Sequence, residues 1–270
     1  MKLRITTILC SIFLALNAWG FGKVGHDAVA YIAECHLTPT AKANIEKYLG
    51  GKSIVYYASW TDDVRLQPAY EHTGGWHSAS VDSLGKHKLW KPRYYAYVGI
   101  NELMDQMEDG GYKQMSDSAV AVGIKLLVHI VGDFHCPSHT FIEGDRFTQN
   151  RYFYVNGDKY KFHKFWDSEL LNRVHKWYYT DYQYQLDRCT PEQIKEIQSG
   201  SLIDWIEGNA AYLRHIYDII TPERHFDEVE TSYFLHDMTE IEEHQILYGG
   251  YRVAHVLNSI FDPDYPRWER

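Results

Sequence analysis

The sequence predicts a mostly α-helical protein with a single domain. Three observations lead to this fold class: apolar residues recur at helical spacing in most segments, the alternating pattern of β-strands occurs in one place, and no repeat or low-complexity linker divides the chain. The glycine patterns of a Rossmann site and of a P-loop are both missing. Setting aside a leader of twenty residues leaves 250 of the 270 residues, which is enough for one sizeable core.

Residues 1–20 have the pattern of a secretory signal peptide. Two basic residues open this segment, residues 5–16 are mostly apolar but too short to span a bilayer comfortably, and Ala18 and Gly20 occupy the −3 and −1 positions of a plausible cleavage site. No later segment is long and apolar enough to be transmembrane. We therefore expect a secreted or periplasmic protein without a stable membrane anchor, whose mature chain begins at Phe21.

The first helices of the mature chain follow directly. Residues 25–36 carry apolar side chains at helical spacing. A second helix, capped by Thr38 or Thr40, is expected to run to Tyr48 and to stop at the glycine pair 50–51.

The middle of the chain alternates between helix and loop. Residues 59–62 are expected to form a short helix or turn, and the stretch 71–87 is rich in Gly, His and Ser, which is typical of a loop. Residues 94–107 have a helical pattern. Residues 117–134 are apolar over most of their length and predict the central buried helix, which ends before Pro137.

One short β-hairpin is expected over residues 151–162. Two runs of alternating aromatic residues flank Asn156-Gly157, a pair that favours a type I′ turn. Three more helices are expected: one from His163 past His175, one over 202–220 and one over 242–261.

The charge of the chain restricts its partners. After removal of the leader, 25 basic side chains stand against 36 acidic ones, which gives a formal charge of −11 with histidine neutral. Such a chain is not expected to bind duplex nucleic acid by charge alone. A site that handles phosphates would need a local positive centre, which bound metal ions could supply.

The cysteines leave two alternatives open. The mature chain has Cys35, Cys136 and Cys189. Three thiols cannot all pair within one chain, so one disulfide with a free thiol and three free thiols are both possible.

The central buried helix carries the first candidate metal ligands. His129 and Asp133 are four residues apart and therefore point from one face of the helix, and His139 follows six residues later. Two imidazoles and a carboxylate at this spacing suit a divalent metal such as zinc. The alternative, from this stretch alone, is a core helix that ends in a hydrogen-bonded histidine.

Five short pieces of the chain carry side chains of this kind. In order, they are Phe21-Gly-Lys-Val-Gly-His26, Ser59-Trp-Thr-Asp62, Trp76-His77, the stretch from His129 to His139, and His163-Lys-Phe-Trp-Asp167. Each piece alone is a weak signal, because a His and an Asp four residues apart more often lie on a solvated helix face. Their occurrence together and in this order indicates one site.

These pieces resemble the S1/P1 nuclease family, which is related in fold to the zinc-dependent phospholipases C. The family's pieces are W-G-x-x-G-H at the mature amino terminus, S-W-A-D, W-H, H-x-x-G-D-x-x-x-P-x-H and N-L-H-x-x-W-D; their counterparts span residues 21–167, and residues 250–258 resemble the family's last helix. The resemblance implies a helical phospholipase C/P1 nuclease-like fold and a catalytic domain over residues 21–270.

The resemblance also implies a cofactor of three Zn²⁺ ions. By its pattern, Asp62, His77, His129 and Asp133 would hold the first zinc; His139, His163 and Asp167 the second; and the α-amine and carbonyl of Phe21 with His26 the third, which Asp133 would bridge to the first. Phe21 stands where the family usually has Trp, and a backbone chelate leaves its side chain without a ligand role. Cleavage after Ala18 would instead give Trp19 as the first residue, but would move His26 out of its spacing.

The implied activity is hydrolysis of single-stranded DNA and RNA to 5′-phosphate products, with 3′-nucleotidase activity, by a monomer. In the family, the close zinc pair activates the attacking water and the remaining zinc assists departure of the 3′-oxygen. Asp62 and Asp133 would be catalytic through the metals, and Arg65 would bind the scissile phosphate as a catalytic and substrate-binding residue. The alternative for Arg65 is an ordinary surface arginine.

The base-binding part of the family pattern is not recognisable. Ser78 and Ser80 stand where fungal members carry an aromatic residue and an aspartate, and residues 147–150 lack the usual Gly-Gly-Asn. The aromatic side chains of 152–160 could stack on bases or simply pack together. Cys136 matches no family ligand.

Two alternative functions are compatible with the same residue pattern. A phospholipase C or another phosphodiesterase could use the same scaffold, but its last ligand pair ends in Glu where this chain has Asp167, and its first histidine lies further from the terminus than His26. A metal-binding protein without catalysis is the third alternative, and the full ligand set together with Arg65 argues against it.

Overall fold

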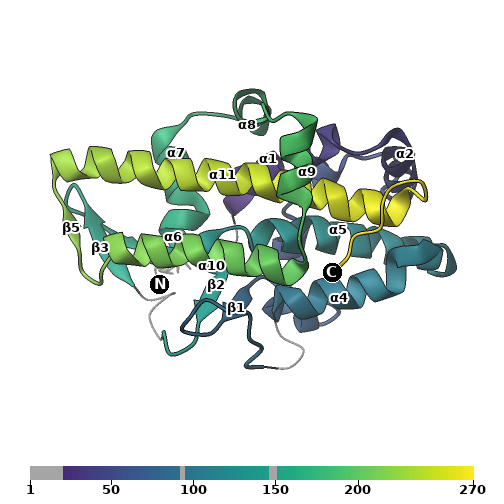
Figure 1. The fold of residues 1–270 in the computed structure, drawn as a ribbon, viewed down its shortest axis with the longest axis horizontal. Coiled ribbons are helices and arrows are strands. Elements are labelled where there is room, and N and C mark those ends of the chain that lie inside the picture. Colours follow the sequence, from purple (N-terminus) through teal and green to yellow (C-terminus); the bar gives the residue numbers. More distant parts are fainter. Residues whose placement is uncertain (1–20, 92–94, 146–150) are drawn as a thin grey trace, which may run out of the picture.

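The computed structural model describes residues 21–91, 95–145 and 151–270. The expected signal peptide, Tyr94 at the start of one expected helix, and residues 147–150 lie outside this part. The described chain is mostly helical, with two small sheets, and one hydrophobic core connects its elements (Figure 1). The mostly α fold class is therefore confirmed.

The helices and strands follow the chain in an order that alternates long helices with short connecting elements. They are α1 Gly22–Cys35, α2 Pro39–Tyr48, α3 Trp60–Val64, β1 Ala79–Val81, α4 Ala96–Met107, α5 Asp117–Asp133, β2 Thr140–Ile142, β3 Tyr152–Val155, β4 Asp158–Lys161, α6 Phe162–Lys164, α7 Leu170–Val174, α8 Tyr179–Leu186, α9 Pro191–Gln198, α10 Leu202–Ile219, β5 His225–Phe226 and α11 Glu228–Phe261. Single 3₁₀ turns connect several of them.

Local capping signals fix the helix starts that the sequence predicts. The Thr38 side chain accepts a hydrogen bond from the backbone N–H of Ala41 at 3.1 Å, so Thr38 rather than Thr40 caps α2. Ser116 caps α5 in the same way through Ala119. Helix α5 is buried from Leu126 to its end, as expected for the central helix.

The long helix α11 forms one side of the molecule and runs along nearly its whole length (Figure 1). It packs against α1 and α5. A glycine permits the closest approach, because a Cβ at Gly250 would lie 2.5 Å from the Ile32 side chain on α1. The two helices therefore hold each other, and α5 beside them, at a fixed separation.

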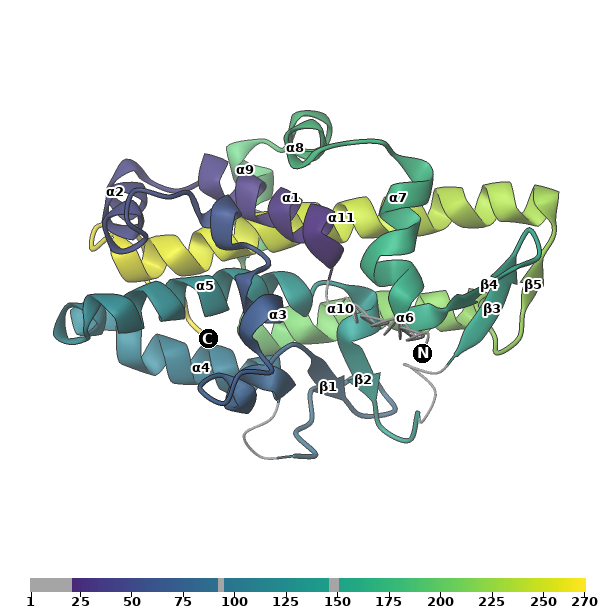
Figure 2. The ribbon, with the colours of Figure 1, turned by 180° about the vertical axis from the view of Figure 1, so that it is seen from behind.

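Two small sheets accompany the helices, and strand β5 of one of them contacts the beginning of α11 (Figure 2). In the first, β1 pairs in parallel with β2, Ala79 opposite Thr140. In the second, β3 and β4 form the expected hairpin, with Asn156 and Gly157 at φ of 52° and 84°. β5 adds to the hairpin, parallel to β3.

The predicted hairpin is present, and β5 extends it to a three-stranded sheet. Two other sequence predictions about these elements were wrong. The segment 71–87 is not only loop, because it contains the 3₁₀ turn Glu71–Gly75 and strand β1. The helix expected to run past His175 ends at Val174 and is interrupted by a wider π-type turn at Phe165–Glu169.

The last third of the chain contains more helix than the sequence predicted. α10 matches the expectation, but α11 begins at Glu228 rather than at residue 242, and α8 and α9 were not expected. Asp227 caps α11 through a reciprocal pair of hydrogen bonds with Glu230. Among the described residues, no helix combines the length and apolar character needed to cross a bilayer. Cys35, Cys136 and Cys189 are free thiols.

Candidate metal centre

Eight of the predicted ligand side chains meet at one place in the fold. They come from α1 (His26), α3 (Asp62), the loop before β1 (His77), α5 (His129 and Asp133), the 3₁₀ turn after α5 (His139), α6 (His163) and the π-type turn (Asp167). All are buried except Asp62, whose side chain is 21% exposed. The cluster therefore opens to solvent on the side of Asp62.

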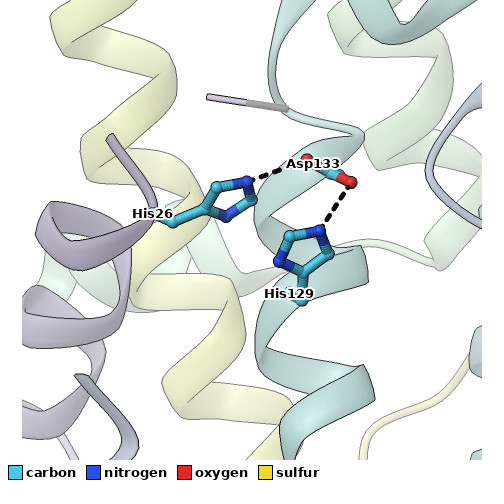
Figure 3. A group of neighbouring side chains, drawn as sticks. All are labelled: His26, His129 and Asp133. Atoms are coloured by element: carbon cyan, nitrogen blue, oxygen red, sulfur yellow. Dashed lines mark ion pairs between the residues drawn. The ribbon is translucent and has the colours of Figure 1, made fainter. Parts of the chain in front are cut away.

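Asp133, at the end of α5, lies between two histidines. Its Oδ1 atom is 3.2 Å from His26 Nε2 and its Oδ2 atom is 3.2 Å from His129 Nε2 (Figure 3). The two imidazole rings stack with centroids 4.1 Å apart. The carboxylate thus faces ligand atoms from α1 and α5 with one oxygen each, which is the geometry that a bridging ligand requires.

A second set of atoms converges beside the first. His77 Nδ1 lies 2.7 Å from Asp133 Oδ2 and 3.1 Å from His129 Nε2. Asp62 Oδ1 is 3.7 Å from His129 Nε2 and 3.8 Å from His77 Nδ1. Four lone-pair-bearing groups therefore lie close together, an arrangement that requires a proton or a cation between them.

The third set extends from the other side of Asp133. His139 Nε2 is 3.4 Å from Asp167 Oδ1, and His163 Nε2 is 3.2 Å from Asp167 Oδ2. The rings of His139 and His163 stack with centroids 4.9 Å apart. His139 Nδ1 lies 3.7 Å from Asp133 Oδ1, so this set adjoins the other two.

Backbone carbonyls orient the histidines. The Nδ1–H group of His129 donates to the Ala58 carbonyl at 2.8 Å, and that of His139 donates to the His77 carbonyl at 2.6 Å. His163 Nδ1 is 3.3 Å from the Ser138 carbonyl. A donor at Nδ1 fixes the tautomer that presents a bare Nε2, as in metal-ligating histidines.

Buried ligand atoms of the cluster lack hydrogen bonds within the described part of the chain, which fits a metal site. Within residues 21–91, 95–145 and 151–270, several buried atoms of the cluster make no hydrogen bond, although buried polar atoms are normally satisfied. They are His26 Nε2, Asp62 Oδ1, His77 Nε2, Asp133 Oδ1, His139 Nε2 and Asp167 Oδ2. Nitrogen and carboxylate oxygen donors of this kind suit zinc.

Three groups of side chains bring their ligand atoms within 4.8 Å of one another and could each hold a metal ion. They are His26 with His129 and Asp133; Asp62 with His77 and His129; and Cys136 with His139 and Asp167. His129 belongs to both of the first two groups. The family pattern instead assigns His129 to one zinc and His26 to another. In the third group, Cys136 takes the place expected for His163.

The carboxylates and imidazoles of the cluster shift one another's pKa values. Burial alone would raise the pKa of Asp133, but His129, His139 and His26 outweigh it and hold this pKa well below its usual range. Burial alone would lower the pKa of His129 and of His139, but Asp133 with Asp62 or Asp167 raises both to about 9. Burial lowers the pKa of His77. In the absence of metal, protons therefore occupy part of the cluster.

Phe21 and Arg65 also lie at the cluster. The Phe21 side chain is fully buried and packs edge-on against the His26 ring, with centroids 6.5 Å apart. A guanidinium nitrogen of Arg65 is 3.7 Å from Asp62 Oδ1, and its side chain is only 12% exposed. Arg65 therefore lies beside the solvent-facing carboxylate of the cluster.

Several other candidates lie outside the set of ligand atoms. His135 is fully buried; its Nδ1–H donates to the Val131 carbonyl and its Nε2 accepts from Arg252. Burial and the neighbouring Glu242 carboxyl raise the pKa of the Cys136 thiol well above its usual value, which disfavours the thiolate that a ligand would need. Ser78 and Ser80 are buried and offer no stacking face for a base.

Sequence reasoning missed three buried polar side chains close to the cluster. Asn209 on α10 and Gln245 on α11 are each 2% exposed, and Glu242 on α11 is fully buried. In the sequence they occur in amphipathic helices, where a polar residue usually marks the solvated face. The one sequence feature that could have indicated their burial is their position next to apolar residues at helical spacing.

Together, the fold and the site define a mostly helical protein with a buried His/Asp centre that could hold divalent metal. The model of the S1/P1 Nuclease family matches residues 21–262. The chain is 22% identical to Endonuclease 5 of Arabidopsis thaliana over 97% of both chains. It is 25% identical to Nuclease S1 of Aspergillus oryzae over 48% of this chain and 47% of that protein, and 27% identical to Nuclease P1 of Penicillium citrinum over 44% and 47%.

The chain belongs to the S1/P1 nuclease family. It is a nuclease, a hydrolase acting on phosphodiester bonds, which decides against a non-catalytic metal-binding protein. Zinc dependence is a property of the family.

Proposed function

We propose that this protein is a zinc-dependent nuclease that hydrolyses single-stranded DNA and RNA, and 3′-nucleotides, to 5′-phosphate products at a site with three zinc ions. The observation that carries the proposal is the set of buried imidazole and carboxylate atoms that converge without hydrogen bonds. Desolvated groups of this kind are costly unless a cation satisfies them.

The proposed ligands divide into three sets. Asp62, His77, His129 and Asp133 hold the first zinc; His139, His163 and Asp167 hold the second; and the Phe21 α-amine and carbonyl with His26 hold the third, with Asp133 as the bridge. Bound zinc would activate water and neutralise negative charge on the phosphate. His163 is preferred to Cys136 because its Nε2 lies 3.2 Å from Asp167 and because Cys136 matches no ligand of the family pattern.

The backbone ligand at Phe21 requires cleavage of the leader after Gly20. Its proposed role is supported by the close approach of the chain start to the cluster: a Cβ at Gly22 would lie 2.4 Å from the carbonyl oxygen of Asp167. The Phe21 side chain is buried against the His26 ring, so it would anchor the terminus beside the cluster. We propose that residues 1–20 are removed on secretion and that the mature enzyme acts as a monomer.

The chain's own residues bind and orient the substrate. Arg65 would place its guanidinium on two oxygens of the scissile phosphate, since it stands beside the exposed edge of Asp62. The buried walls on the other sides exclude water, which strengthens each charge interaction in the site. The fold offers no aromatic face at positions 78 and 80, so single-strand selectivity would have to arise from other surfaces.

Side-by-side hydrolysis of four substrates tests the proposal: single-stranded DNA, RNA, a 3′-nucleotide and phosphatidylcholine. Turnover of the three nucleotide substrates, lost on chelation and restored by zinc, is the expected result. Turnover of the lipid alone would move the activity to the phospholipase C alternative and would contradict the proposed substrate class.

A further inference from the structure

The chain between Asp133 and His139 is a buried turn outside regular helix. Helix α5 ends at Asp133, and residues 134–140 are buried throughout. A short 3₁₀ turn over Pro137–His139 provides only part of the backbone hydrogen bonding. Buried carbonyl groups that leave a helix need donors from elsewhere, because an unsatisfied one is costly.

Asn209 on α10 donates two hydrogen bonds to this turn. Its side-chain Nδ2 group donates to the Phe134 carbonyl at 2.7 Å and to the Thr140 hydroxyl at 2.7 Å. Phe134 and Thr140 are the first and last residues of the turn. One amide group therefore fixes both of its ends.

Gln245 supplies a third donor from α11. Its Nε2 group donates to the His135 carbonyl at 2.8 Å and also to Asn209 Oδ1. Because the two carbonyl groups can only accept, both amides have a single orientation that satisfies the network. Both Nδ2 hydrogens and the Oδ1 atom of Asn209, and both Nε2 hydrogens of Gln245, are then used inside the protein.

We infer that Asn209 and Gln245 are positioning residues of the metal centre, which act through the turn 134–140. This inference rests on the proposed zinc-dependent function. The hydrogen bonds of both amides within the described part of the chain go to the turn and to each other, and they fix the backbone that carries Asp133 at one end and His139 at the other.

The turn matters because it connects two parts of the cluster. Asp133 faces His26, His77 and His129, whereas His139 faces Asp167. The length and shape of the turn set the distance between these parts. A rigid turn of this kind holds the ligand side chains in the geometry that binds metal. Without it, the ligands would move apart whenever the metal leaves.

Two variants of similar volume test the inference: Asn209→Leu and Gln245→Met. Each replaces the polar amide by an apolar side chain of similar shape and so removes the hydrogen-bond donors. Thr239→Val is the matched control, because Thr239 is also a buried polar residue of α11, but its hydrogen bond among the described residues goes to the Leu235 carbonyl within its own helix. Thr140→Val, which removes a single acceptor of Asn209, is a milder variant that serves if either of the first two does not fold.

Three readouts separate positioning from general loosening: the affinity for zinc in competition with a chelator, the visible absorption spectrum of the cobalt-substituted protein, and kcat against KM for a 3′-nucleotide. We expect folded Asn209→Leu and Gln245→Met to bind at least one zinc about 10–100-fold more weakly. We also expect an altered cobalt spectrum and a fall in kcat rather than a rise in KM. The double variant should be no weaker than the worse single variant, because the two amides act as one unit.

Two outcomes would overturn the inference. The first is zinc affinity and a cobalt spectrum like those of the unchanged protein in the folded variants. The second is an equal loss in Thr239→Val, which would indicate general loosening of α11. If the unchanged protein itself binds fewer than two zinc ions and turns over no nucleotide, the proposed function fails instead, so the two failures are distinguishable.

Discussion

Arg65 is the residue whose role depends most on the shape of its side chain. Its guanidinium stands 3.7 Å from the exposed carboxylate of the cluster, where a phosphate would arrive. Arginine can donate two parallel hydrogen bonds to phosphate, whereas the lysine ammonium is a point charge on a flexible stem.

We therefore expect Arg65→Lys to lower kcat/KM for single-stranded DNA by about 10-fold, the loss of roughly one charge-assisted hydrogen bond. Zinc content should remain unchanged. Hydrolysis rates and metal analysis of the same samples measure both quantities. A variant as active as the unchanged protein would remove Arg65 from the phosphate-binding role.

Glu242 is a buried carboxyl group without a hydrogen bond from the described residues. Burial, together with the neighbouring Asp167 carboxylate, raises its pKa well above the usual value. A raised pKa in the folded state means that the protonated acid stabilises the fold fully at pH values below the unfolded pKa of about 4.5. This contribution is lost as the pH rises through the folded pKa.

In protein stripped of metal, Glu242→Gln should therefore increase the free energy of unfolding at pH 8 by about 1 kcal/mol or more, with a smaller difference at pH 4.5. Urea unfolding at both pH values measures this change. Glu240→Gln, at an exposed position of the same helix, is the control and should change stability by less than about 0.5 kcal/mol. Equal effects of the two substitutions would show that burial of Glu242 is not the cause.

At the scale of elements, the contact between α1 and α11 determines where His26 lies. A Cβ at Gly250 would meet the Ile32 side chain at 2.5 Å, whereas a Cβ at Gly208 on α10 would meet nothing within 4 Å. Both glycines lie inside helices, where alanine is intrinsically more favourable than glycine. This propensity term is therefore the same for the two positions.

We expect Gly250→Ala to destabilise the protein by about 1–3 kcal/mol, because the helices must separate. Gly208→Ala should instead stabilise it, by up to about 1 kcal/mol. Thermal or denaturant unfolding of the two variants provides the comparison. The same sign for both would contradict the close packing of α1 on α11.

The predictability of each element depended on how local its stabilising contacts are. Helix α5 and the hairpin around Asn156-Gly157 were predicted because apolar spacing and turn residues are local signals. Strands β1 and β2 were not, since each is three residues long and its partner lies about sixty residues away in the sequence. The beginning of α11 was missed because exposed apolar residues such as Val229 and Tyr233 obscure its amphipathic pattern.

The site shows the same division. The candidate ligand side chains could be named from the sequence because five short pieces of the chain resemble, in order, the pattern of the S1/P1 nuclease family. The amides of Asn209 and Gln245 could not, since only the packing of α10 and α11 against the turn reveals what they bond. The interruption of the helix at Phe165–Glu169 was also not predictable, because it aligns Asp167 with His139, a contact distant in sequence.

At the scale of the whole molecule, protons and metal ions compete for one buried cluster. His129 and His139 have a pKa of about 9 in the metal-free protein, raised above the usual value of 6.5. Their protonated forms stabilise the metal-free fold fully below pH 6.5, and this contribution is lost as the pH rises through about 9. Zinc binding must displace these protons.

The affinity for zinc should therefore increase with pH between about 6.5 and 9 and level off above, by up to about 100-fold per pH unit if two protons are released. Chelator competition across this range measures the slope, and the metal-free protein should lose stability over the same range. An affinity that does not change with pH would mean that these histidines are not ligands.

The measurement that tests the central claim most directly is the zinc content of the mature protein beginning at Phe21, compared with that of Asp133→Asn. We expect three zinc ions per chain with hydrolysis of single-stranded DNA. In Asp133→Asn we expect fewer zinc ions and at least a 100-fold loss of turnover, whereas Asp63→Asn, at an exposed neighbour of Asp62, should be unchanged. Fewer than two zinc ions in the unchanged protein, or full activity in Asp133→Asn, would contradict the proposed metal centre.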